Sequence, residues 1–132
     1  LVNSDLGSLQ GNVVLNGYFD WGWTIDVYLY TSSDYRFPVA QAKMNGNPFT
    51  GYLYRFSNIE GIHYMDGSMG PMTYYVRAVA KNISDGTTYY GFPPAGYEYF
   101  DVEEGEGINH DYTRNLTISQ PPTGRRRGAV LD

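Results

Sequence analysis

The chain has 132 residues, the size of one domain whose core is large enough to fold without cross-links. Its 9 Lys and Arg face 14 Asp and Glu, and this mildly acidic balance argues against nucleic acid as a partner. The absence of cysteine excludes disulfides, a thiol nucleophile and a cysteine-ligated zinc site.

Alternating apolar and polar residues predict short strands along most of the chain. Residues 1–10 are expected to form a loose N-terminal arm or a short edge strand, and the first strand of the domain is expected at residues 11–17. Apolar and polar residues alternate most clearly at residues 24–31, where the second strand is expected. Further strands are predicted at residues 36–44, with Phe37 and Val39 in the core, and at residues 51–59, 72–81, 97–102 and 110–119.

The strand at residues 72–81 is expected to be central, because β-branched and aromatic residues fill it with a two-residue period. One side of it carries Tyr74, Val76, Ala78 and Ala80, and the other carries Tyr75, Arg77 and Lys81. No helical period appears over a useful length. About seven strands with turns roughly every ten residues predict an antiparallel two-sheet sandwich at residues 11–119, followed by a Pro/Gly/Arg tail at residues 120–132.

Four short motifs support a family resemblance over about residues 11–119. They are Gly11 and Val13, then Phe56, Asn58, Ile59 and Gly61, then Tyr74–Ala78, and last Val102–Glu106 in an acidic turn. This pattern resembles the carboxypeptidase regulatory-like domains, which have the transthyretin-like (prealbumin-like), immunoglobulin-type sandwich. The resemblance implies a fold and says little of function, because these motifs are structural.

No catalytic set is predicted, since the acidic residues cluster in turns rather than across a cleft, and we expect a non-enzymatic protein. One acidic turn contains glycine and closely spaced oxygen ligands, which suit calcium. A solvated hairpin turn would explain the same residues. The possible calcium ligands are Asp101, Glu103, Glu104, Glu106, Asn109 and Asp111.

Aromatic residues on and beside the second strand are candidates for sugar or subunit contact. They are Trp21, Trp23, Tyr28 and Tyr30, to which outward Tyr75, Tyr97 and Tyr99 would add. Flat rings stack on the apolar faces of sugars, so a glycan is a possible partner. The same rings could instead cover the sandwich itself.

The two ends of the chain predict self-assembly, because the edge of a sheet accepts an added donor strand. A basic tail would also meet the acidic body of the next copy, and contacts that do not close give filaments or tubes. The expected assembly residues are Leu6, Leu9, Arg125, Arg126, Arg127, Val130 and Leu131.

The sequence thus predicts a non-catalytic extracellular structural subunit that forms a filament, tube or surface layer with copies of itself. The alternative is a carbohydrate-binding or accessory module of a larger secreted protein. The Tyr-rich, Lys-poor composition is typical of exported surface proteins, and a signal peptide is expected to have been removed. No apolar run approaches the roughly 20 residues of a transmembrane helix.

Overall fold

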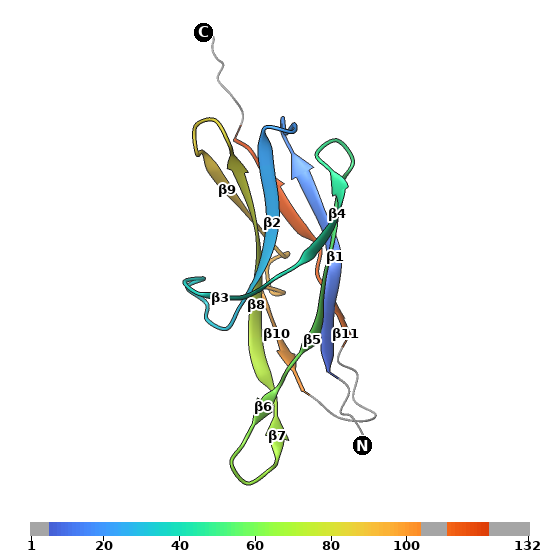
Figure 1. Ribbon diagram of the computed structural model, residues 1–132, viewed down its shortest axis with the longest axis vertical. Helices are drawn as coiled ribbons and strands as arrows, with labels where there is room; N and C mark the ends of the chain where they lie inside the picture. The colour runs from blue at the N-terminus through green and yellow to red at the C-terminus, as the bar shows by residue number, and fades with distance from the viewer. Residues whose placement is uncertain (1–5, 104–110, 122–132) are drawn as a thin grey trace.

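The computed structural model describes residues 6–103 and 111–121, except the side chains of His63 and Met69, and this part of the chain is all-β without helices (Figure 1). Its strands are β1 (Gly7–Asn16), β2 (Trp23–Tyr30), β3 (Pro38–Gln41), β4 (Lys43–Asn47), β5 (Gly51–Ile59), β6 (Ile62–His63), β7 (Met69–Gly70), β8 (Met72–Asn82), β9 (Thr88–Phe92), β10 (Tyr99–Val102), β11 (Asp111–Thr113) and β12 (Leu116–Ser119).

The main sheet is nearly closed. Its hydrogen-bonded path runs β3-β2-β8-β9-β12-β1-β5-β4, while β10 pairs with β8 and β11 pairs with β1. The end strands β3 and β4 follow one another in the chain with only Ala42 between them, so the sheet curves around a single core. The β6–β7 hairpin pairs only with itself and projects from one end of the elongated molecule (Figure 1).

Strand β8 lies near the middle of one half of this sheet. It pairs with β2 along the whole of Trp23–Tyr30 and, on its other edge, with β9 and β10. In the other half, β1 pairs with β5 in antiparallel fashion and with β11 and β12 in parallel fashion. The predicted central position of residues 72–81 agrees with this pairing.

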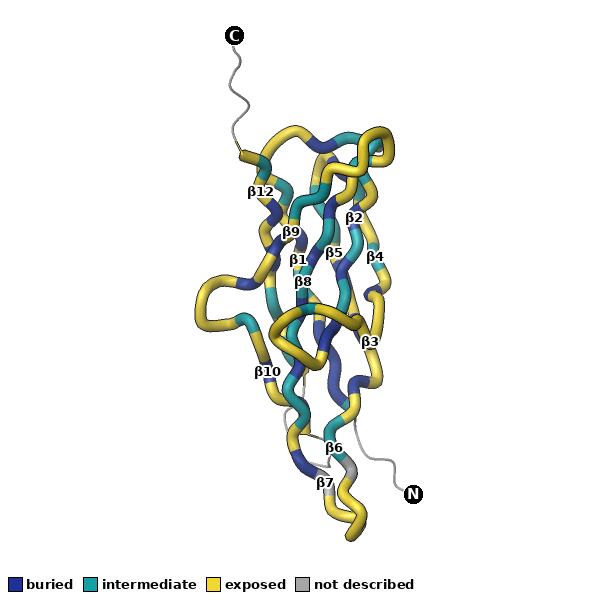
Figure 2. Tube along the Cα trace, turned by 90° about the vertical axis from the view of Figure 1, so that its left-hand side faces the viewer, coloured by how far each residue is buried: buried dark blue, intermediate teal, exposed yellow. Residues whose placement is uncertain are grey.

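Apolar residues at alternate positions of the strands form one core, as the dark blue segments of Figure 2 show. The predicted inward residues of β2 and β8 are all buried, and so are Phe100 and Val102 of β10. The largest fully buried side chains are Leu9, Val13, Val27, Val76, Val102, Leu116 and Ile118.

Two predicted boundaries were wrong. Strand β1 begins at Gly7, so residues 7–10 belong to the same strand as residues 11–16. The stretch 36–44 is two strands that bend at buried Ala42, and its Phe37 and Val39 are 74% and 54% exposed instead of lying in the core. Breaks of this kind raise the number of strands well above the seven expected.

Two positions in this sheet depend on the backbone conformation that their residues allow. A Cβ atom at Gly11 would lie 1.9 Å from the carbonyl oxygen of Arg114, so only glycine fits where β1 passes the break between β11 and β12. Asn58 has a φ of 60° and lies where the pairing of β1 with β5 shifts register. The resulting bulge turns Ile59 into the core.

Candidate functional site

The outer side of β2, β8, β9 and β10 carries a continuous layer of rings, which we call the aromatic face. Its rings are Tyr28, Tyr30, Tyr35, Tyr75, Tyr90, Phe92 and Tyr99. Strand alternation produces it, because Tyr30, Tyr75 and Tyr99 lie directly opposite one another on three neighbouring strands. The ring centroids of successive neighbours in this layer lie 5.2 to 6.5 Å apart.

Arg77 lies at the centre of the aromatic face. Its guanidinium carbon is 4.1 Å from the ring centroid of Tyr90, 4.8 Å from that of Tyr35 and 5.2 Å from that of Tyr30. One terminal nitrogen donates a hydrogen bond to the Tyr30 hydroxyl at 3.2 Å. The Nε atom of Arg77 is buried without a hydrogen-bond partner among the described residues. Cation–π contacts with the ring faces offset the cost of burying this charged group.

Tyr35 closes the aromatic face from the loop between β2 and β3. Its ring packs edge-on against Tyr30, Tyr75 and Phe92, and its backbone has a φ of 54°. Positive φ is uncommon for a bulky residue and persists where the surroundings hold it. The Tyr35 ring thus packs this loop against the outer side of the sheet.

Two hydroxyl groups of the aromatic face, those of Tyr28 and Tyr35, are hydrogen-bonding groups rather than bases at neutral pH. Burial raises the pKa of Tyr28 and, in spite of nearby Arg77, that of Tyr35. Rings on β9 and β10 remain well exposed, with Tyr99 at 53% and Tyr90 at 47%. The face thus combines fixed ring surfaces with phenol hydroxyl groups.

The four aromatic residues predicted as one contact surface divide between three places. Tyr28 and Tyr30 belong to the aromatic face, although Tyr30 itself is buried beneath Tyr35. Trp23 points inward and stacks on Tyr89 at 5.7 Å. Trp21 is exposed in the loop after β1, where its ring meets Phe49 at 6.1 Å. Strand alternation separates Trp23 from Tyr28, and only Tyr28 and Tyr30 could form a joint surface.

Sequence reasoning also missed members of the aromatic face. Tyr90 and Phe92 alternate with inward Tyr89 and Gly91, so the period of β9 contains the signal for them. Tyr35 has no such signal, because its place depends on a left-handed turn that bulky residues rarely adopt. Tyr97 lies outside the face and packs against Arg114.

On the other side of the core, the outer surface of β1, β5 and β4 is polar, and we call it the amide face. Asn12, Leu53 and Asn45 lie opposite one another in one row across three strands. Gln10, Arg55 and Lys43 form the neighbouring row. The two rows line a hollow of about 890 Å³.

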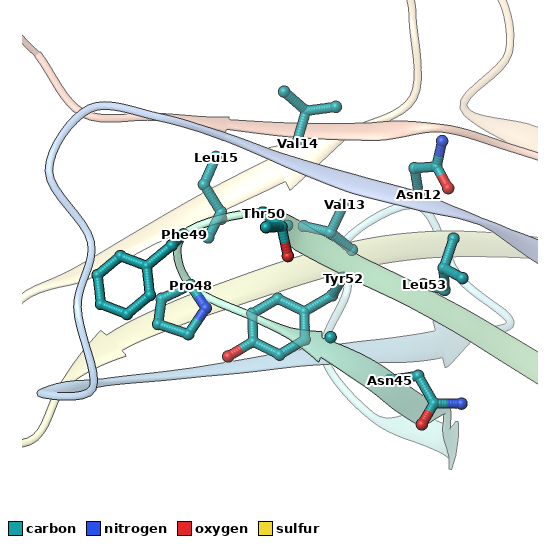
Figure 3. A pocket seen from close by; sticks show the side chains of 12 residues that line it. Asn12, Val13, Val14, Leu15, Asn45, Pro48, Phe49, Thr50, Tyr52 and Leu53 are labelled. Atoms are coloured by element: carbon teal, nitrogen blue, oxygen red, sulfur yellow. The ribbon is translucent and has the colours of Figure 1, made fainter.

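A second hollow of about 460 Å³ adjoins the first toward the turn between β4 and β5 (Figure 3). The two hollows share Asn12, Asn45 and Leu53, so together they form a continuous depression along the sheet. In Figure 3 these three side chains lie at one end, and Pro48 and Phe49 lie at the other.

The predicted calcium ligands do not gather within the described part of the chain, where no group of three carboxylate or His residues lies close enough to hold a metal. Asp101 accepts a hydrogen bond from Thr73 Oγ1 at 2.5 Å on β10. Asp111 accepts one from Ser8 Oγ at 2.7 Å on β11. Glu103 is exposed, and Glu104, Glu106 and Asn109 lie outside the described residues.

Among the predicted assembly residues, Leu9 is fully buried in the core of its own chain, so it is not free to pack against a neighbouring copy. Leu6 is partly buried just before β1. The remaining residues of that set, Arg125, Arg126, Arg127, Val130 and Leu131, lie outside the described residues.

Comparison of the chain with protein-family models, with curated proteins and with solved structures finds no match. Within the described residues, no helix has the length and apolar character that crossing a membrane requires.

Proposed function

We propose that this protein is a non-catalytic binding module that holds carbohydrate against its aromatic face. The observation that supports this proposal is the layer of seven rings packed around Arg77 on one outer side of the sheet. Tyr90, Phe92 and Tyr99 of this layer are exposed, and exposed apolar surface of this kind marks an interaction site.

The chemistry of the face suits sugars. A pyranose ring presents apolar C–H patches on its faces and hydroxyl groups around its edge, and tyrosine presents an apolar ring with a hydroxyl at its tip. Each phenol both donates and accepts hydrogen bonds. Because β8, β9 and β10 hold Tyr75, Tyr90 and Tyr99 in place, little side-chain freedom is lost on binding.

Retention on insoluble cellulose, chitin and xylan, followed by titration with the soluble oligosaccharide of any polymer that binds, tests this proposal. Tyr90→Ala and Tyr99→Ala should each weaken binding about three- to tenfold, since one ring contact contributes roughly 0.5–1.5 kcal/mol. Tyr64→Ala is the matched control, because Tyr64 is an exposed tyrosine in the distant β6–β7 turn. Failure to bind any of these polymers, or equal binding by all variants, would contradict the proposal.

We also propose that the nearly closed sheet divides into the two layers of a transthyretin-like sandwich and that the protein works outside the cell. Two register pairs, Thr117 with Phe92 and Ile118 with Gly91, join β12 to β9 and thereby connect the two halves of the path. Inward residues of both halves pack into one core, which is the arrangement that a sandwich requires.

A second candidate function is assembly with copies of the same chain, which the two open edges of the sheet favour. Strand β3 is exposed throughout, and in the described structure neither β3 nor β4 is paired on its outer edge. Light scattering of the full chain, and of a chain without residues 122–132, tests this candidate with calcium and with chelator. Large particles that disappear on trimming support assembly through the tail, and a monomer under all conditions excludes assembly.

A further inference from the structure

Two positive charges lie side by side on the amide face. Lys43 of β4 and Arg55 of β5 are directly opposite in the antiparallel register, and both are exposed. Like charges in this arrangement destabilise a strand pair. The chain as a whole is acidic, with a net charge of −5, so this pairing is not the consequence of a general excess of basic residues.

Within the described residues, no carboxylate neutralises this pair. Arg55 donates hydrogen bonds to Gln10 Oε1 at 2.6 Å and to Ser57 Oγ at 3.3 Å, and both partners are neutral. Neither Lys43 nor Arg55 forms an ion pair there. The nearby carboxylate of Asp26 instead accepts a hydrogen bond from Gln41 at 3.0 Å. Among the described residues, the other N–H groups of Arg55 have no acceptor and can serve a bound anion.

The surroundings of the two cations indicate what kind of anion would fit. The larger hollow is lined by the amides of Gln10, Asn12, Asn45 and Asn115. An amide group both donates and accepts hydrogen bonds, as a sugar hydroxyl does, whereas inorganic phosphate or sulfate needs mainly donors. Leu53, 60% exposed at the centre of the row, offers an apolar patch for a C–H face.

We propose that the amide face binds an acidic polysaccharide of uronic-acid units. A sugar carboxylate lies between Lys43 and Arg55, since a planar carboxylate matches the guanidinium fork. Hydroxyl groups of the same unit bind the amides, and the next unit follows the depression toward Phe49. This site uses other residues and another side of the sheet than the aromatic face, so it stands independently of the function proposed above.

Calorimetric titration of the full chain with a hexamer of galacturonic acid tests this site, with the uncharged galactose hexamer as the neutral counterpart. Lys43→Gln and Arg55→Gln should each weaken binding of the acidic hexamer about tenfold, because hydrogen bonds to charged groups are the strong ones. Lys81→Gln is the matched control, since Lys81 is an exposed lysine on β8. Neither substitution should lower the melting temperature, because each relieves the like-charge contact.

Asn45→Ala separates a sugar site from a simple anion site. It should weaken binding of the acidic hexamer while leaving any binding of inorganic sulfate unchanged. Equal binding of the acidic hexamer by the parent chain, Lys43→Gln and Arg55→Gln would overturn the proposal, and so would equal losses in Lys81→Gln. A third outcome is that the parent chain does not bind the hexamer but self-associates, and that Lys43→Gln abolishes this self-association. The two cations would then contact another copy of the chain, and the proposal would be wrong.

Discussion

Arg77 shows how one side chain can hold a surface together. Its charge lies over three tyrosine rings, and a cation–π contact contributes about 0.5–2 kcal/mol depending on burial. We expect Arg77→Met, which keeps the length and removes the charge, to lower the free energy of unfolding by about 1–2 kcal/mol. Urea unfolding measures this change. Lys81→Met, on the same side of β8, is the control. An equal effect of the two substitutions would show that the contacts between Arg77 and the tyrosine rings do not stabilise the fold.

Tyr54 is the residue through which alkaline pH should act on stability. Burial raises its pKa above the usual value near 10, and its hydroxyl donates to the Arg114 carbonyl at 2.6 Å. Below about pH 10 the phenol is protonated in both states. Above it the unfolded chain loses the proton first, so folding becomes less favourable as pH rises.

Melting temperatures measured between pH 8 and pH 11 should therefore fall more steeply for the parent chain than for Tyr54→Phe. At neutral pH the same variant should lose about 1 kcal/mol, because it lacks the hydrogen bond to Arg114. Tyr18→Phe, which removes the hydroxyl of an exposed ring, is the matched control. Parallel slopes for parent chain and Tyr54→Phe would show that other tyrosines dominate the alkaline transition.

At the scale of the residue, alternation predicted most of the inward positions, because a strand with one buried face must place apolar side chains two apart. It correctly placed Val76 and Val27 in the core and their neighbours Arg77 and Tyr28 on the outer side of the sheet. It could not place Tyr35, whose ring reaches the aromatic face from a loop with positive φ. A loop has no period, so its side chains are placed only by what they pack against.

The bulge at Asn58 decides how β5 ends. Asn58 has a φ of 60°, which asparagine tolerates and β-branched residues do not. We expect Asn58→Gly to leave stability nearly unchanged and Asn58→Val to cost about 1–2 kcal/mol, which is the usual penalty for this region. Thermal unfolding monitored by circular dichroism checks both. Ser57→Val, one residue earlier on the exposed side of β5, should be harmless, and equal losses at both positions would point away from backbone strain.

Elements that cross between the two halves of the sheet were the hardest to predict. Alternation shows that Phe37 and Val39 share a side, but it does not show whether that side is covered. The chain leaves the edge beside β2 at β3 and reaches the edge beside β5 at β4, and only Ala42, at the bend, is buried. The amide face could not be predicted for another reason. Its rows of side chains depend on the register between β1 and β5, which are far apart in the sequence.

For the whole molecule, hydrogen exchange should follow the pairing of the strands. Strand β8 is hydrogen-bonded on both edges and carries the core, so its amides should exchange only by global unfolding. The β6–β7 hairpin pairs only with itself, and residues 62–70 should exchange by local opening. Mass spectrometry of peptides covering both regions checks this order, with the chain unfolded in urea as reference. Similar rates in the two regions would contradict the central place of β8.

The parallel pairing of β1 with β12 has a mechanical consequence. Val13–Asn16 and Leu116–Ser119 run in the same direction, so the start of β1 and the end of β12 lie at opposite ends of the pair. Tension applied between these two points slides the strands past each other lengthwise. All the hydrogen bonds between them are then loaded together in shear, whereas a hairpin pulled at its open end unzips one bond at a time. A chain held at one end and pulled at the other would therefore resist force through the hydrogen bonds between β1 and β12.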